Sequence, residues 1–147
     1  MDFNSLVADF AARHNVNGLA AEDNAAALDI DGIVVTLVAA NDVLSLSAEI
    51  GEPPAEGRAD FADMLLEANL QADFFFAKTP ETGAYIVIRR LALASLDNEA
   101  FDDALEALVN QAETWRRLLE DFRPVAAEAA EAEEASAAFP NAGFMSV

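Results

Sequence analysis

The residues that could carry acid–base chemistry are few and scattered. His14 is the only histidine in the 147-residue chain. A catalytic histidine usually needs a carboxylate that orients it and a nucleophile beside it. Ser5 and Asp9 are close in sequence, but together with His14 they form no triad motif. A histidine near the end of a helix also interacts favourably with the helix dipole, and we expect this structural role for His14.

Two acidic motifs fall short of metal sites. The run Asp29-Ile-Asp31-Gly32 is similar to the start of a calcium loop, but it lacks the third acidic position and the closing glutamate. It is more typical of a tight hairpin turn. Asp102, Asp103 and Glu106 form an acidic helix face, which we interpret as solvated because no histidine or cysteine accompanies it. We therefore expect no catalytic residue, no metal and no cofactor, and a binding protein rather than an enzyme.

The charge balance limits the possible partners. Eight basic residues stand against 27 acidic ones, giving a formal net charge of −19, although 54% of the residues are hydrophobic. Such a chain would be repelled by nucleic acid and by anionic membranes, so neither is expected as a partner. The charge favours solubility and, weakly, a basic partner. The absence of cysteine, of a signal-like N-terminus and of a long apolar run predicts a cytoplasmic protein.

The first elements would form one face of a core. Phe3, Leu6, Val7 and Phe10 recur at helical spacing, and Asp2 could cap that helix. Residues 15–24 are interpreted as a loop. Three strands are predicted over 25–30, 33–39 and 43–50, with tight turns at 31–32 and 41–42. The strand 33–39 is apolar on both faces, which indicates a central position in the sheet.

The middle of the chain carries more apolar surface than one core needs. After a connector over 51–57, a helix is predicted over 58–70, where Leu66 and Leu70 widen the apolar stripe. Side chains alternate along a strand, so Phe74, Phe75 and Phe76 cannot all face one core. A turn over 80–83 and a strand over 84–93 follow. A second subunit is one way to cover the excess.

A long helix closes the predicted domain. It begins at a cap on Asp97 or Asn98 and carries its stripe to Phe122, with Trp115 as its largest member. Residues 124–147 hold four glutamates and no lysine or arginine, and we predict a disordered acidic tail there. The prediction is one α+β domain over 1–123, with an antiparallel, twisted sheet of about five strands flanked by three helices.

This order of elements resembles the Tir-chaperone (CesT) family, the class I chaperones of bacterial type III secretion. The more specific similarities are the run from Phe61 to Leu70 before an apolar strand, the turn over 80–83, and the strand ending in Arg89-Arg90-Leu91. They also include Leu96-Asp97 and the run from Ala107 to Trp115. The resemblance covers about residues 1–123.

The resemblance implies a homodimer that holds the N-terminal chaperone-binding segment of a secreted effector in extended form. It also implies no need for ATP, and it raises the secretion apparatus as a further partner. The implied effector-binding patches comprise Phe3, Leu6, Val7, Phe10, Val35, Leu37, Leu44 and Leu46. The implied dimer interface comprises Leu65, Leu66, Leu70, Phe74, Phe75 and Phe76. For each of these residues, an ordinary place in the core is the alternative.

A different class of function stays open at this point. An acidic adaptor or regulatory module could bind a folded protein partner, for example by mimicking the charge of nucleic acid. Such binding would weaken steeply with salt. Binding through apolar contacts would respond to salt only mildly, which distinguishes the two hypotheses.

Overall fold

The computed structural model describes residues 2–70 and 73–123. The described residues form three α-helices, one short 3-10 helix and six strands. In chain order these are α1 (Phe3–His14), β1 (Asn17–Glu22), β2 (Ala25–Ile30), β3 (Ile33–Ala40), β4 (Val43–Gly51), α2 (Arg58–Ala68), β5 (Phe75–Lys78), β6 (Tyr85–Ala92), η1 (Leu93–Ser95) and α3 (Asn98–Glu120).

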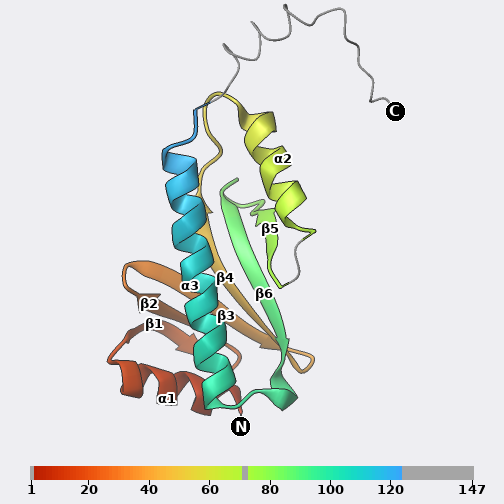
Figure 1. Cartoon of the computed structure of the whole chain (residues 1–147). Coiled ribbons are helices and arrows are strands. Elements are labelled where there is room, and N and C mark those ends of the chain that lie inside the picture. The colour runs from red at the N-terminus through yellow and green to blue at the C-terminus, as the bar shows by residue number, and fades with distance from the viewer. Residues whose placement is uncertain (1, 71–72, 124–147) are drawn as a thin grey trace, which may run out of the picture.

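The strands make one antiparallel sheet in the order β1-β2-β3-β4-β6-β5. Figure 1 shows α3 running along one face of this sheet, with α1 and α2 near its opposite ends. The predicted α+β fold, with an antiparallel sheet and three helices, is therefore confirmed. The predicted acidic tail over 124–147 lies outside the described residues.

One local prediction was wrong. Residues 15–24 were interpreted as a loop, but residues 17–22 form the edge strand β1, which pairs with β2. The segment Asn-Gly-Leu-Ala-Ala-Glu has no alternation of apolar and polar residues that would indicate a strand. Pairing with β2 supplies the strand geometry that the local sequence does not specify.

Turn chemistry fixes the register of the central strands. Asp31 and Gly32 have φ angles of 54° and 86°, and Asn41 and Asp42 have 52° and 63°. Positive φ at both central residues is what a tight hairpin turn requires, and Gly32 N–H also donates to Asp29 Oδ1 at 2.9 Å. Both predicted turns are confirmed. They place Ile33 opposite Ile30 and Val43 opposite Ala40.

The helix ends also follow the sequence. The Asp2 side chain accepts a hydrogen bond from Ser5 N–H, and the Asp97 side chain accepts one from Ala100 N–H, each at 2.8 Å. Both are N-caps that satisfy an amide left without an intrahelical partner. The backbone hydrogen bond at Ser5 lowers the pKa of the Asp2 carboxyl.

The core lies between the sheet and the helices. Burial alternates along β3, where every second residue from Ile33 to Ala39 is buried. The α3 helix buries Phe101, Ala104, Leu105, Leu108, Val109 and Ala112 against the same layer. Trp115, Leu119 and Phe122, which continue the predicted stripe, are partly buried against this core. Among the described residues, no helix is long and apolar enough to cross a membrane.

Candidate partner-binding surfaces

The face of the sheet opposite the core has no covering element among residues 2–70 and 73–123. Val34 and Val38 on β3 are 40% and 43% exposed, and Val43 on β4 is 38% exposed. The β5 side chain of Phe75 is 49% exposed at the sheet's edge. These four large apolar groups lie on the uncovered side of the sheet, which we call the open sheet face.

Cross-strand register connects Phe75 on the edge strand to the middle of this face. Phe75 lies opposite Ile88, Ile88 opposite Ser47, and Ser47 opposite Thr36. This row crosses four strands without a charged residue. Charged residues flank this row on the same face, because Asp29 pairs with Val34 and Arg90 pairs with Ser45, the partner of Val38. Large apolar side chains gathered on one exposed face and rimmed by polar residues are typical of a surface that another chain covers.

A second apolar surface is formed by α2 and the turn that follows it. Leu66 and Leu70 are 64% and 89% exposed, and Met64 is 37% exposed. Beside them a cleft of about 270 Å³ opens between α2 and the strands β5 and β6. Leu65, Leu66, Phe76 and Tyr85 are among its lining residues. We call this the α2–β5 surface.

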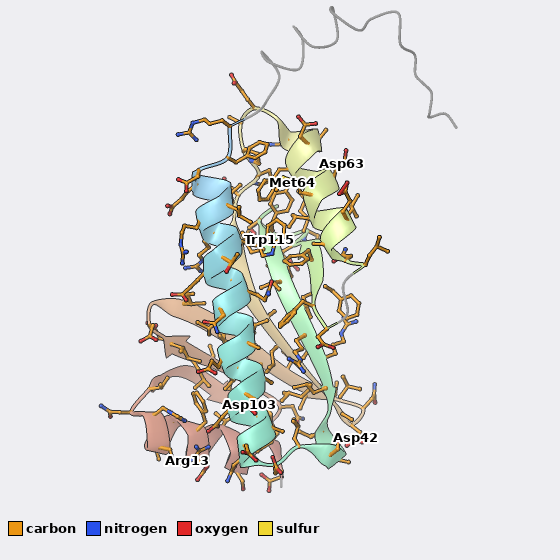
Figure 2. The ribbon with its side chains drawn as sticks, viewed as in Figure 1. Arg13, Asp42, Asp63, Met64, Asp103 and Trp115 are labelled. Atoms are coloured by element: carbon orange, nitrogen blue, oxygen red, sulfur yellow. The ribbon has the colours of Figure 1, made fainter. Side chains whose placement is uncertain are left out.

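An aromatic cluster holds α2 against α3 and β6. The fully buried Phe61 ring stacks on Tyr85 at 5.6 Å between ring centroids and meets Phe122 edge-on at 5.2 Å. Trp115 contacts Phe61 at 6.0 Å and Phe76 at 4.9 Å. Figure 2 shows Trp115 on α3 near α2 and β6. The α2–β5 surface therefore rests on a rigid base.

A side-chain clamp fixes the end of α2 to β5. Asn69 Oδ1 accepts a hydrogen bond from Phe76 N–H at 2.6 Å, and Asn69 Nδ2 donates to the Phe76 carbonyl at 3.3 Å. One amide group thus satisfies both backbone groups of a residue on an edge strand. Phe75, the preceding residue on β5, points to the other face, because successive side chains alternate along a strand.

Charged side chains join α1 to α3 at the other end of the molecule. The Arg13 guanidinium donates to both carboxylate oxygens of Asp102 and also to Asp9. His14 Nε2 lies 3.2 Å from Asp102 Oδ2. The Arg13 hydrogen bond holds the pKa of the Asp102 carboxyl below its ordinary value, and the carboxylates raise the pKa of Arg13. The expected structural role of His14 agrees with this placement.

The residues predicted for effector binding lie mainly beneath the surface. Val7 is partly buried and the other seven are buried: Phe3, Leu6, Phe10, Val35, Leu37, Leu44 and Leu46. They come together in one core under α1 and α3. Phe10 also lines a groove between α1 and α3. A partner could reach the other buried residues only if a helix moved, so the role of this set in binding stays a prediction.

The residues predicted for the dimer interface divide between core and surface. Leu65 and Phe76 are buried, whereas Leu66, Leu70 and Phe75 are exposed. Phe74 is half-buried, and the Arg89 guanidinium lies over its ring at 5.5 Å from the centroid. The structure brings all six to α2, β5 and the segment between them.

Sequence reasoning did not name Val34, Val38, Val43 or Met64 as surface candidates. The signal for β3 was present, because residues 33–39 are apolar on both faces. We took this to indicate a central position in the sheet, which the strand order confirms. Within the described chain only one face is covered, so the second apolar face becomes exposed surface.

The chemistry of these surfaces is that of protein binding. Among the described residues, no group of three or more histidine, cysteine, aspartate or glutamate side chains could hold a metal ion. The two apolar surfaces and the sheet-and-helix architecture define an α+β protein-binding domain.

The comparisons identify the family. Residues 5–116 match the model of the Tir chaperone protein (CesT) family. This match covers most of the 147 residues, and the chain therefore belongs to that family of class I type III secretion chaperones. No curated protein matches the sequence.

Solved structures share the fold. The ExsC–ExsE complex gives a TM-score of 0.68 at 27% identity, covering 81% of this chain and 97% of that one. The Yersinia pestis type III secretion chaperone SycH, solved with a fragment of YscM2, gives 0.62 at 21% identity, with coverages of 78% and 99%. YbjN, a putative transcription regulator from E. coli, gives 0.60 at 13% identity, with coverages of 80% and 91%. The fold alone therefore does not decide the function.

Proposed function

We propose that this protein is a cytoplasmic, non-enzymatic chaperone of a bacterial type III secretion system. It binds the N-terminal segment of a secreted effector in extended form and keeps that segment soluble without ATP hydrolysis. Family membership supports the class of function. Among structures with this fold, the HopA1–SchA chaperone–effector complex is an example of such pairing.

The observation that carries the proposal is the open sheet face. Val34, Val38 and Val43 expose apolar area beside the uncharged Thr36 and Ser47. An unfolded segment that orders on binding must bury about 1,000–3,000 Å² to offset its lost chain entropy. An exposed face that carries several large apolar side chains can supply such area without specific chemistry. The predicted residues Val35, Leu37, Leu44 and Leu46 would support this face from beneath.

We also propose a homodimer through the α2–β5 surface. Leu66 on α2 lines the cleft together with Leu65 and Phe76, and Leu70 is exposed in the turn after α2. Together they supply the protrusion and hollow that an isologous contact needs. Phe75 lies at the edge shared with the open sheet face, so a dimer would present two such faces together.

The test is capture of the partner by the native chain from its own cells, followed by limited proteolysis and mass spectrometry. We expect a secreted protein protected over an N-terminal segment. The double variant Val34→Asp/Val38→Asp should lose this partner while circular dichroism stays unchanged. Thr114→Asp/Ala94→Asp adds the same charge at exposed positions and should retain it.

Salt separates this proposal from binding by an acidic adaptor. Apolar contacts should survive washing at 1 M salt, where the Debye length falls to about 3 Å. A folded cytoplasmic partner that is released by salt and held equally by the Val34→Asp/Val38→Asp variant would overturn the chaperone proposal.

A further inference from the structure

A groove of about 380 Å³ lies between α1, the β2–β3 turn and α3. It is separate from both the open sheet face and the α2–β5 surface. Its apolar lining comes from Phe10, Ile30, Leu105 and Val109. Three of these side chains, Phe10, Leu105 and Val109, are at most 6% exposed, so the groove has a firm floor.

The rim of the groove carries an excess of negative charge. Asp31, Asp103, Glu106 and Glu113 line it, and within residues 2–70 and 73–123 none of the four has a basic side chain at ion-pairing distance. Figure 2 shows Asp103 on the half of α3 that lies near α1. Carboxylates around an apolar floor lower the local potential and favour a cation.

The chain itself already places one cation at the end of this groove. The Arg13 guanidinium pairs with Asp102 beside the groove residues Phe10 and His14. The Phe10 and His14 rings are in contact, with 4.4 Å between their centroids and a tilt of 36°. This end of the groove therefore combines two aromatic rings with a carboxylate and the guanidinium that it binds. Of the other rim carboxylates, Asp31 and Glu113 also line a neighbouring hollow with Arg116 and Arg117, without an ion pair to either. Asp103 and Glu106 lie farther from these arginines along α3 and likewise have no ion pair within the described residues.

The dimensions fit a short stretch of extended chain. From Asp103 to Glu113 the α3 wall is about 15 Å long, because a helix rises about 1.5 Å per residue. An extended chain advances about 3.3 Å per residue, so about five residues would span the groove. A long basic side chain can lay its methylene groups on an apolar floor while its charge meets the rim.

We propose that this groove binds a short extended segment of the effector that carries a basic residue next to an apolar one. The proposal rests on the chaperone function above and adds a charge-selective subsite to it. The open sheet face would supply apolar area with little discrimination. The groove would favour partners whose basic residue lies against the rim carboxylates, because an acidic residue at that position would be repelled.

The test uses the full chain, labelled with ¹⁵N, and two synthetic peptides. One is acetyl-Ser-Leu-Arg-Leu-Ser-amide, and the other replaces arginine with citrulline, which has nearly the same shape but no charge. We expect amide shifts in the arginine titration at the end of α1, at residues 30–31 and at 103–113. The citrulline peptide should bind about tenfold more weakly, the scale of one charge-assisted hydrogen bond.

A pair of charge-matched variants locates the effect. Glu106→Gln/Glu113→Gln should reduce the preference for the arginine peptide about tenfold, so that the two peptides bind with about equal affinity. Glu52→Gln/Glu56→Gln removes the same charge from the exposed connector before α2 and should leave the preference unchanged.

Equal binding of the two peptides, absence of binding up to millimolar concentration, or shifts confined to other surfaces would overturn the groove proposal. Any of these results would leave the chaperone proposal intact if Val34→Asp/Val38→Asp still abolishes partner capture. If that variant retains the partner while the groove variant loses it, the sheet-face contact is wrong and the groove contact stands.

Discussion

Arg13 on α1 and Asp102 on α3 are joined by two hydrogen bonds, although 89 positions separate them in sequence. The contact fixes the N-terminal helix over the end of the core. It also removes one carboxylate from the acidic groove, because the guanidinium occupies both oxygens of Asp102. The stability of α1 and the charge of the groove therefore depend on the same pair.

Asp102→Asn should weaken this end of the molecule in a pH-dependent way. The pKa of Asp102 is lowered in the folded state, chiefly by the Arg13 hydrogen bond. Its contribution to stability is therefore fully present above the ordinary value of 3.8 and is lost as pH falls through the lower folded pKa. Urea unfolding at pH 7 and at acid pH measures the contribution of Asp102 to the free energy of unfolding.

The difference in unfolding free energy between wild type and Asp102→Asn should be largest at pH 7 and should shrink in acid. Asp103→Asn changes the neighbouring exposed residue, which has no ion pair among the described residues, and is the control. A wild-type advantage that grows as pH falls would contradict the assigned role of the pair.

Phe61→Ala should be more destabilising than truncation of Trp115 on α3 or Phe75 on β5. The ring is fully buried and contacts Tyr85, Trp115 and Phe122. Removing such a side chain costs about 3–5 kcal/mol, because the cavity cannot close completely. Chemical denaturation measures the loss. Trp115→Ala should cost less because its ring is only partly buried, and Phe75→Ala, half-exposed, should cost least.

Leu66→Asp/Leu70→Asp should convert a dimer into a folded monomer. Both side chains are exposed in the single chain, so the fold loses little. A carboxylate placed in an apolar interface must be desolvated, which should weaken association roughly tenfold or more per site. Light scattering after gel filtration measures the mass. Leu118→Asp, at an exposed position on α3, should leave the mass unchanged. A double variant that is still dimeric would place the interface elsewhere.

Asn69→Ala should destabilise β5 locally while the rest of the sheet stays folded. The change leaves Phe76 N–H and C=O without their side-chain partner, which costs about 1–3 kcal/mol for a buried polar group. Hydrogen exchange should accelerate at residues 75–78 and not in β3. Asn110→Ala, an exposed asparagine on α3, provides the comparison. Uniform acceleration over the whole sheet would mean that Asn69 supports the global fold instead.

Much of the local structure was decided by residues close together in sequence. Asp2 and Asp97 cap helices through amides three positions away. The pairs Asp31-Gly32 and Asn41-Asp42 form turns because they accept positive φ. Regular apolar spacing predicted all three helices to within a few residues. These features depend on contacts between residues a few positions apart, so the local sequence is enough to predict them.

Tertiary structure decided which apolar residues are surface. Val34 and Val35 are adjacent valines, but Val34 is exposed and Val35 is buried, because the helices cover only one face of β3. Pairing with β2 made β1 a strand despite its weak pattern. The contacts of Arg13 with Asp102 and of Asn69 with Phe76 required the assembled fold. By itself the sequence determined the elements and the excess of apolar area; long-range packing determined where that area is exposed, since exposure depends on distant segments.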